Sequence, residues 1–414
     1  MQVAVIGGGV VGVCTAYFLA EAGHDVAVVE RRNNVAEQAS FGNAGIVAPG
    51  HATPWAAPGM PGRVLSQLFR SDSPIILRPR FDRAMWTWLR RWMAECDIER
   101  YRINRERMQR VAFYSRDIMA MLDERYRLEF EQTRGYLQLF RTERDLKLAQ
   151  PALDMLADSG IAHHVLDPAG ARAVEPSLAE GTALAGAIHL PDDQAGNCPL
   201  FTKQMRYLAQ TLGAEFHFNT HVRAIERRGG GIVLQIEDRE FEADAVVIAA
   251  GADSAGILAS LGIRVPLYPV RGYSATAPIK DFEAAPISAL MDESYKVTIT
   301  RLGNRIRIAG TAELGTDGTA LRDAALRTLV RIGEDWFPQA ANYHAANFWS
   351  GARPMLPDGA PLIGATPVRG VYVNIGHGGN GWAMAAGSGK LVADLVSGRA
   401  PDIDTDGLTL SRYG

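Results

Sequence analysis

The stretch Gln2-Val3-Ala4-Val5-Ile6-Gly7-Gly8-Gly9-Val10-Val11-Gly12 places a short strand-like run directly before a Gly-x-Gly-x-x-Gly turn. The pattern that follows predicts a helix over 11–22, ended by Gly23, and a second strand over 25–30. In such a βαβ unit, backbone amides at the helix N-terminus can approach a pyrophosphate. The first residues of the chain therefore predict a dinucleotide-binding sheet.

A carboxylate at the end of the second strand supports this prediction. Glu30 follows Gly12 by 18 residues, and at this place an acidic side chain accepts hydrogen bonds from an adenosine ribose. The alternative is a glycine-rich turn of some other α/β protein, which the strand, the helix and Glu30 together disfavour. Because NAD and FAD both carry ADP, this segment does not choose between them.

A second glycine-rich turn, Gly376-His377-Gly378-Gly379-Asn380-Gly381-Trp382, lies between a predicted strand at 371–375 and a predicted helix over about 382–396. Free amides and a helix dipole at this place stabilise negative charge, which a reduced flavin develops at N1 and O2. Two such turns far apart indicate one extended cofactor held at both ends. We therefore predict FAD, bound non-covalently, rather than NAD.

The composition is that of a globular protein without an electrostatic surface for nucleic acid. Hydrophobic residues make up 47% and charged residues 21% of the 414 residues, and the formal net charge is -3. The three cysteines lie far apart, so we expect neither a disulfide framework nor a metal site. We expect no signal peptide and no run approaching the roughly 20 apolar residues of a spanning helix, and hence a cytoplasmic protein.

The order of the predicted elements indicates an α/β protein, α+β overall, with a Rossmann-like FAD-binding domain and an inserted antiparallel-sheet substrate domain. Strands predicted at 267–275, 295–301 and 305–310 form the antiparallel part, and Gly303-Asn304 joins the last two as a hairpin turn. We assign residues 1–80, 144–265 and 346–414 to the FAD-binding domain, and residues 81–143 and 266–345 to the substrate-binding domain.

Longer strings resemble one family of flavoproteins. They include Ser40-Phe41-Gly42-Asn43-Ala44-Gly45 and its continuation to Gly50, Tyr268-Pro269-Val270-Arg271-Gly272-Tyr273-Ser274, and the segments 54–59, 137–142, 197–202, 292–301, 349–364 and 376–389. Over nearly its whole length the chain resembles the D-amino acid dehydrogenases of the small-subunit type. These belong to the superfamily of D-amino acid oxidase, glycine oxidase and sarcosine oxidase.

The resemblance implies where the cofactor binds. The ADP half would meet the first glycine-rich turn and Glu30, the flavin would lie beside 40–45 and approach 378–381, and Val222 would lie by the adenine. With their neighbours, the predicted cofactor-binding residues are Gly7, Gly9, Val10, Val11, Gly12, Glu30, Arg31, Ser40, Asn43, Ala44, Gly45, Val222, Gly251, Gly376, Gly378, Gly379, Asn380 and Gly381.

Four residues are candidates for the catalytic site. By resemblance, Arg353 clamps the substrate carboxylate, for which a guanidinium presents a matching fork; the alternative is a structural arginine. Tyr295 matches a tyrosine that relatives place over the flavin, and Tyr273 is the second choice, although either is compatible with core packing. His51 is a candidate for tuning substrate choice or accepting a proton, or is an ordinary loop histidine.

The resemblance implies FAD-dependent oxidative deamination of D-amino acids to 2-oxo acids and ammonia, by hydride transfer from Cα to flavin N5. Three alternatives stay open: a D-proline or cis-4-hydroxy-D-proline dehydrogenase that gives a cyclic imine, a glycine- or sarcosine-type amine oxidase, and, in another class, the flavin-binding module of an RNA-modification protein. Relatives called dehydrogenases pass electrons to a quinone, so we expect a quinone-type acceptor.

The pattern from about Pro79 to Arg127 predicts one or two long amphipathic helices. Within it, 85–93 combines tryptophans and arginines as a helix at a membrane interface does, which suggests peripheral membrane contact. An amphipathic helix packed over the core is the alternative. The sequence makes no prediction of the oligomeric state.

Overall fold

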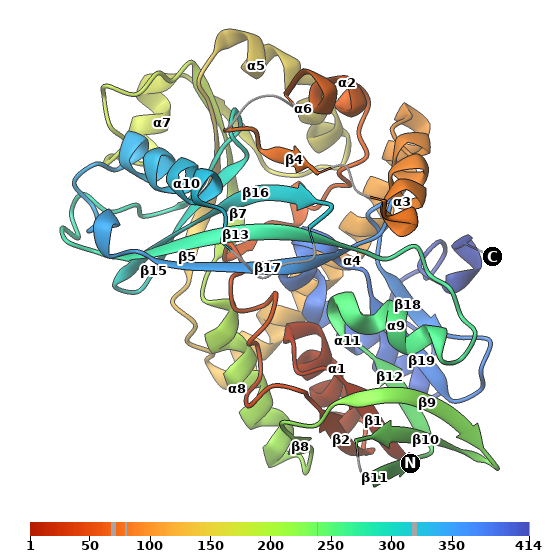
Figure 1. The fold of residues 1–414 in the computed structure, drawn as a ribbon. Coiled ribbons are helices and arrows are strands. Elements are labelled where there is room, and N and C mark those ends of the chain that lie inside the picture. Colours follow the sequence, from red (N-terminus) through yellow and green to blue (C-terminus); the bar gives the residue numbers. More distant parts are fainter. Residues whose placement is uncertain (68–71, 79–80, 238, 317–320, 414) are drawn as a thin grey trace.

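The protein contains a six-stranded sheet, drawn in the lower part of Figure 1, and a ten-stranded sheet, drawn in its upper part. The computed structural model describes residues 1–67, 72–78, 81–237, 239–316 and 321–413. The beginning of the predicted helical segment at Pro79 lies outside these residues. The predicted mixture of a Rossmann-like sheet and a mainly antiparallel sheet is confirmed.

The six-stranded sheet has the order β18-β19-β12-β1-β2-β8 and is parallel except for β18. Its strands are short and, apart from β8, mostly apolar, and all positions of β12 are buried. Their bounds are β1 (Gln2–Ile6), β2 (Asp25–Val29), β8 (Glu215–His217), β12 (Ala245–Ile248), β18 (Leu362–Ala365) and β19 (Val371–Ile375).

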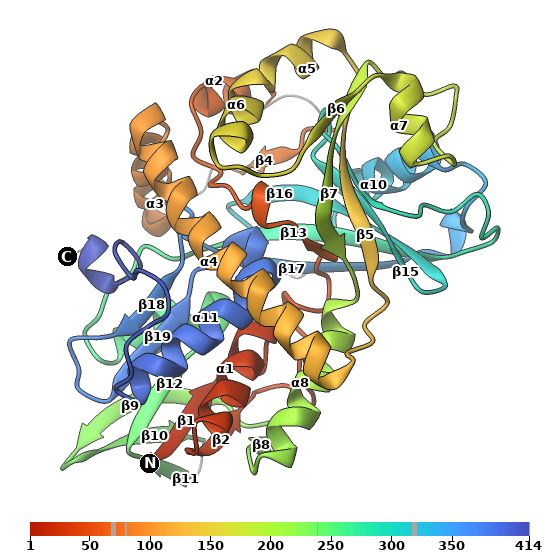
Figure 2. The same cartoon turned by 180° about the vertical axis from the view of Figure 1, so that it is seen from behind.

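Helices cover one face of this sheet, and a small sheet covers the other. The helices are α1 (Val10–Glu21), α4 (Ile98–Tyr126), α8 (Cys198–Thr211) and α11 (Gly381–Val396), and Figure 2 shows α4 running obliquely across α11. Glycines allow this close packing: a methyl group on Gly389 of α11 would lie 2.8 Å from the Thr15 amide of α1. On the other face lie β9 (Val222–Arg228), β10 (Gly231–Ile236), β11 (Arg239–Ala243) and α9 (Ser254–Ala259).

The ten-stranded sheet has the order β17-β13-β16-β15-β14-β5-β7-β3, with β4 beside β16 and β6 beside β7. Most neighbours are antiparallel, and β15 and β16 form the predicted hairpin. The strands are β3 (Ile46–Val47), β4 (Ile75–Leu77), β5 (Thr133–Phe140), β6 (His164–Leu166), β7 (Gly186–Ala195), β13 (Tyr268–Pro278), β14 (Ala289–Asp292), β15 (Val297–Leu302), β16 (Arg305–Leu314) and β17 (Asn347–Met355).

Several helices pack around this second sheet, whereas the 3-10 turn at the C-terminus packs on β18 of the six-stranded sheet. The helix α10 (Asp323–Trp336) packs on it through Trp336 and its neighbours in one buried cluster. The remaining elements are α2 (Met60–Gln67), α3 (Arg83–Ala94), α5 (Glu143–Leu148), α6 (Gln150–Asp158), α7 (Pro168–Val174), and the 3-10 turns η1 (Pro49–His51), η2 (Gly251–Asp253), η3 (Tyr343–Ala345), η4 (Gly378–Asn380) and η5 (Leu410–Tyr413).

The chain crosses between the two sheets more often than the predicted domain ranges allow. The strands β3, β4, β7 and β17 fall in ranges assigned to FAD binding but belong to the ten-stranded sheet. Conversely, α4 falls in a range assigned to substrate binding but packs on α1 and α11. The difference arises because the periodicity of a segment predicts its type and its buried face, but not the sheet that it joins.

The tryptophan-rich helix packs mainly against the core. The prediction of one or two long helices is confirmed by α3 and α4, whose N-termini are capped by the carboxylates of Asp82 and Asp97. Trp88 donates a hydrogen bond from Nε1 to the Met355 carbonyl at 3.0 Å and stacks on Trp92. None of the helices in the described ranges is long and apolar enough to cross a membrane.

Candidate active site

A cavity of about 1230 Å³ lies between the two sheets. It is larger than the roughly 300–1,000 Å³ of pockets for drug-sized ligands, as a dinucleotide requires. The first turn of α1, the end of β2, the loop 37–48, η1 and the turn before α11 all line it, together with one face of the ten-stranded sheet. The two glycine-rich turns of the sequence therefore open into one cavity.

At one end of the cavity, α1 begins after a glycine, so no side chain of its N-cap residue covers the first backbone amides. Gly9 occupies the N-cap of α1, and Gly7, Gly9, Val10 and Val11 line the cavity. Gly12 does not line it: a methyl group there would lie 2.0 Å from the Gly7 carbonyl, so this glycine allows α1 to approach the strand. The first turn thus presents backbone amides to an anionic group.

Glu30 lies beside this turn and lines the cavity. One of its carboxylate oxygens accepts a hydrogen bond from the Gly8 amide at 2.6 Å, and the other accepts from the Arg32 amide at 2.8 Å. These bonds fix the carboxylate at the carboxyl end of β2, where an adenosine ribose would bind. The predicted residues Arg31, Val222 and Gly251 line the same end of the cavity, and Arg31 forms an ion pair of 2.7 Å with Asp253.

The loop after β2 is fixed by hydrogen bonds from both sides. Ser40 Oγ accepts from the Val10 amide at 3.1 Å, and Asn43 Oδ1 accepts from the Gly45 amide at 2.8 Å. From the ten-stranded sheet, Arg307 donates to the Asn43 carbonyl at 3.1 Å. Ser40, Asn43 and Ala44 line the cavity, whereas Gly45 lies behind it at a φ of 86°.

The turn before α11 closes the cavity from the other side. Gly376, Gly378, Gly379, Asn380 and Gly381 all line it, and α11 begins at Gly381. Within the described residues, the Asn380 side chain makes no capping hydrogen bond to α11, so the first amides of this helix stay available.

Polar atoms without partners in the described structure also fit the binding of a polar group in the cavity. Two buried atoms of cavity-lining side chains, Asn374 Oδ1 and Trp382 Nε1, have no hydrogen-bond partner among the described residues. His377 in the same turn bonds Ser388 Oγ at 3.1 Å, and burial lowers the pKa of His377 to about 3, so this histidine is neutral. The two helix N-termini, Glu30 and the size of the cavity fit FAD.

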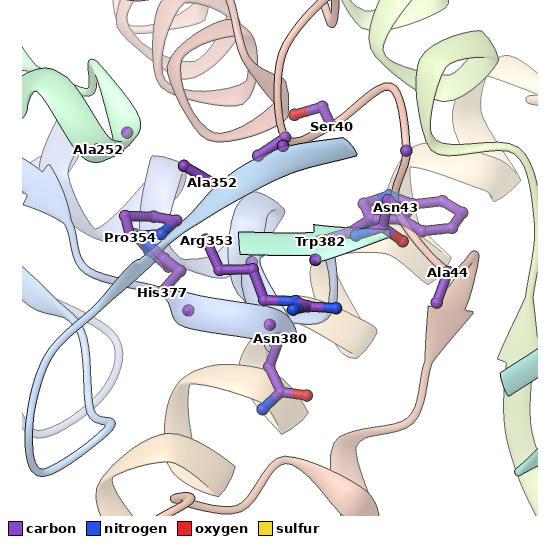
Figure 3. A pocket seen from close by; sticks show the side chains of 18 of the residues that line it. Ser40, Asn43, Ala44, Ala252, Ala352, Arg353, Pro354, His377, Asn380 and Trp382 are labelled. Carbon is purple, nitrogen blue, oxygen red and sulfur yellow. The ribbon is translucent and has the colours of Figure 1, made fainter. Parts of the chain in front are cut away.

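Arg353 projects from β17 into the cavity, toward the space between Asn380 and the loop of Asn43 and Ala44 (Figure 3). Its guanidinium lies flat over Gly272, where a methyl group would come within 2.4 Å of it. Nη1 donates to the Thr311 carbonyl at 2.9 Å, and no carboxylate of the described residues pairs with the side chain. Burial lowers the pKa of Arg353 to about 10, so it stays charged, and it has no counter-ion within the described residues.

The structure treats the two candidate tyrosines differently. Tyr273 lines the cavity, but its hydroxyl donates to the buried carboxylate of Glu313, and burial and this carboxylate raise the pKa of Tyr273. Tyr295 is not among the residues that line the cavity; its ring packs between Arg141 and Arg331. The structure therefore does not bring Tyr295 together with Arg353.

His51 lines the cavity from η1 and is not an exposed loop residue. Its Nδ1 accepts a hydrogen bond from Gln138 at 2.6 Å, and burial lowers the pKa of His51 to about 4. A neutral imidazole with Nε2 protonated follows from this arrangement.

Sequence reasoning missed several cavity-lining side chains near Arg353 and His51. Trp55 stacks near the Arg353 guanidinium, with 5.9 Å between the guanidinium carbon and the ring centre. Further cavity-lining residues include Arg63, Asp145, Glu293, Lys296 and Thr311. Lys296 follows Tyr295 directly in the segment 292–301. This segment, which led to the prediction of Tyr295, therefore also contains Lys296, which lines the cavity.

The FAD dependent oxidoreductase family matches residues 2–395. Since this match covers most of the chain, the protein belongs to this family, and FAD is its cofactor. The prediction of FAD from the second glycine-rich turn is thereby confirmed.

The relatives narrow the class further. The chain is 46% identical to the D-amino acid dehydrogenase of Methylobacterium radiotolerans and 43% identical to D-amino acid dehydrogenase 1 of Mesorhizobium japonicum, with 100% of this chain and of each relative covered. Among solved structures, glycine oxidase from Geobacillus kaustophilus superposes with a TM-score of 0.79 at 26% identity, covering 100% of this chain and 99% of that one. The resemblance to D-amino acid dehydrogenases is confirmed.

Proposed function

We propose that this protein oxidises small D-amino acids to 2-oxo acids and ammonia. The observation that carries the proposal is Arg353, a charged side chain that has no counter-ion in the described part of the chain and lies in the cavity that accommodates FAD. A substrate carboxylate supplies the missing negative charge, and the guanidinium fork binds it through two parallel hydrogen bonds. The names of the full-length relatives supply the amino acid and its D configuration.

The residues around Arg353 orient the substrate and keep water away. Gly272 and Trp55 limit the positions of the guanidinium, and with it the positions of the bound carboxylate. When bound, FAD supplies the two-electron acceptor for the hydride that leaves the substrate α-carbon. The amine loses its proton on or before binding, and water hydrolyses the imino acid to the 2-oxo acid and ammonia.

His51 takes part as a neutral group. Because its pKa is lowered to about 4, it bears no charge that would repel an ammonium substrate near neutral pH. We assign it to substrate positioning. Tyr273 contributes its ring to the cavity wall, since its hydroxyl is engaged by Glu313. We assign no catalytic role to Tyr295, because it lies outside the cavity.

For the electron acceptor we propose a quinone-type molecule, reached at a membrane surface through α3. Arg83, Trp86, Arg90 and Met93 are exposed and follow helical spacing on the face of α3 opposite to buried Trp88 and Trp92. If the purified protein binds anionic vesicles at low salt, this result will support the contact. Vesicle binding that is unchanged in the double variant Trp86→Ser, Met93→Ser excludes this face.

Product analysis tests the proposed reaction. The FAD-loaded protein is incubated with an artificial electron acceptor and with each enantiomer of alanine, proline and leucine, and with glycine, sarcosine and cis-4-hydroxy-D-proline. We expect 2-oxo acid and ammonia in equal amounts from the acyclic D-enantiomers only. A cyclic imine from the proline compounds alone assigns the D-proline or hydroxyproline alternative, and turnover of glycine or sarcosine alone contradicts the proposal.

A further inference from the structure

The turn between β14 and β15 carries two charged residues that line the cavity, Glu293 and Lys296. The turn is fixed: Asp292 Oδ1 accepts hydrogen bonds from the amides of Ser294 at 3.0 Å and Tyr295 at 3.3 Å. The other oxygen of Asp292 is held by Arg141 at 2.7 Å and by Trp336 at 2.8 Å. The position of the turn is therefore set by the core of the second sheet.

Two residues with left-handed backbone conformation meet at this wall of the cavity. Lys296 has a φ of 51° and Thr311 has a φ of 56°, and both line the cavity. For a β-branched residue such as threonine this conformation is costly, and strain of this kind concentrates at binding sites. The two residues also lie close together: a methyl group on Gly310 would be 3.1 Å from the Lys296 carbonyl.

The register of the hairpin relates Lys296 to Arg353. Thr298 of β15 pairs with Ala309 of β16 at the end of the paired register, and Lys296 and Thr311 lie two residues beyond this pair. Lys296 borders Gly310, and Arg353 donates to the carbonyl of the next residue, Thr311, at 2.9 Å. The two cations therefore approach one region of the cavity beside the same part of β16.

Glu293 holds Lys296 in place. Lys296 Nζ pairs with one carboxylate oxygen of Glu293, while the other oxygen is buried and has no partner among the described residues. The Lys296 side chain remains 49% exposed, so its other N–H donors stay available. Burial opposes the ionisation of Glu293, but Lys296, His51 and Arg63 outweigh it and hold the pKa of Glu293 below its usual value.

We propose that Lys296, positioned by Glu293, is a second cationic contact for the substrate. The Lys296 ammonium donates a hydrogen bond to an oxygen on the side chain of the substrate. The preferred substrates are then D-amino acids with a hydroxyl, carboxamide or carboxylate on the side chain. This inference rests on the proposed function, because it takes Arg353 to bind the α-carboxylate.

The charges at this end of the cavity also disfavour cationic side chains. Arg353, Lys296 and Arg63 are the positive groups that line it, and the negative group nearest to Lys296, Glu293, is already paired. Asp145 lines the cavity from α5 and is half-buried, and one of its oxygens accepts a hydrogen bond from the Thr142 hydroxyl at 2.8 Å. A substrate with a side-chain ammonium would place a further positive charge among these groups.

Pairs of substrates of similar shape provide the test. The rate of anaerobic flavin reduction divided by the substrate dissociation constant is measured for D-threonine against D-valine, and for D-asparagine against D-leucine. We expect the oxygen-bearing member to be favoured about tenfold or more, as for a hydrogen bond to a charged group. In Lys296→Met, which keeps the length of the side chain and its Cβ, both ratios fall to about one.

A second measurement does not depend on turnover. Succinate and butyrate have similar chains but differ in the second carboxylate, and their dissociation constants are read from the absorbance change of bound FAD. We expect tighter binding of succinate, and loss of this difference in Lys296→Met. Glu293→Gln, which keeps the shape and removes the charge, should reduce the difference only in part, and Lys296→Arg should retain it.

Lys280→Met is the matched control. Lys280 is exposed in the loop that follows β13 and is not among the residues that line the cavity, so its loss should leave every ratio unchanged. The role of Lys296 is overturned if the substrate-pair ratios in Lys296→Met equal those of the wild type. It is also overturned if this variant changes only the reoxidation of the flavin by the acceptor. If no D-amino acid reduces the flavin, the proposed function fails, and the comparison of succinate with butyrate still tests Lys296 by itself.

Discussion

Replacing Arg353 with methionine removes the cation that we assign to the substrate carboxylate. In the wild type this guanidinium is enclosed, and no carboxylate of the residues that the structure describes pairs with it, so the substrate forms a charge-assisted pair away from water. Losing one partner of such a pair costs about 2–4 kcal/mol, which corresponds to roughly 30- to 700-fold. We predict a loss of this size in kcat/KM for D-alanine.

Steady-state kinetics with an artificial acceptor measure the effect, and two further variants separate it from misfolding. Arg353→Lys keeps a point charge without the fork and should recover part of the loss. Arg271→Met removes an arginine of neighbouring β13 that bonds Ser350 at 2.9 Å and does not line the cavity, and should retain most activity. A kcat/KM within about threefold of the wild type in Arg353→Met, at equal FAD content, would refute the carboxylate clamp.

Three further predictions concern Gly42 and Glu30, which line the part of the cavity assigned to FAD, and the neutral, buried His377. In Gly42→Ala, the new methyl group would lie 1.9 Å from the Trp349 ring, so we expect purified protein with less bound FAD, measured as the ratio of flavin to protein absorbance. In Glu30→Gln, loss of the charged acceptor should weaken FAD binding about tenfold, measured by titrating the apoprotein; unchanged affinity would exclude Glu30 from the ribose site. Burial lowers the pKa of His377 to about 3, so below about pH 6.5 the unfolded chain takes up a proton before the folded protein does. The contribution of neutral His377 to the free energy of unfolding is therefore complete above about pH 6.5 and is lost toward pH 3. His377→Asn should make Tm less dependent on pH in this range. An unchanged pH dependence would contradict a buried, neutral His377.

The cofactor half of the site could be predicted from sequence because backbone geometry leaves few choices there. Gly7 has a φ of 113°, and a methyl group on it would lie 2.5 Å from the Ala249 carbonyl, so glycine is required at this turn. The turn at Gly376 and Gly378 has similar requirements, with φ values of 81° and 56°. Such constraints are local, and they appear directly as residue types at fixed spacing.

The substrate half depended on contacts that local patterns do not encode. Tyr295 and Lys296 are adjacent in one turn, and only the folded hairpin decides that Lys296 lines the cavity while Tyr295 packs between two arginines. The buried side of α3 was similarly undetermined, because tryptophans suit both a core and a membrane interface. Trp88 is buried and Trp86 is 49% exposed, so the helix combines both features.

Anaerobic reduction of the bound flavin by paired enantiomers tests the central claim most directly, because it requires no electron acceptor. The absorbance of the FAD-loaded protein is followed after addition of D- and L-alanine, and then of D- and L-serine. The account predicts bleaching by the D-enantiomers and none by the L-enantiomers at the same concentration. Bleaching by L-enantiomers, or by neither, would contradict the assignment of this cavity to D-amino acid oxidation.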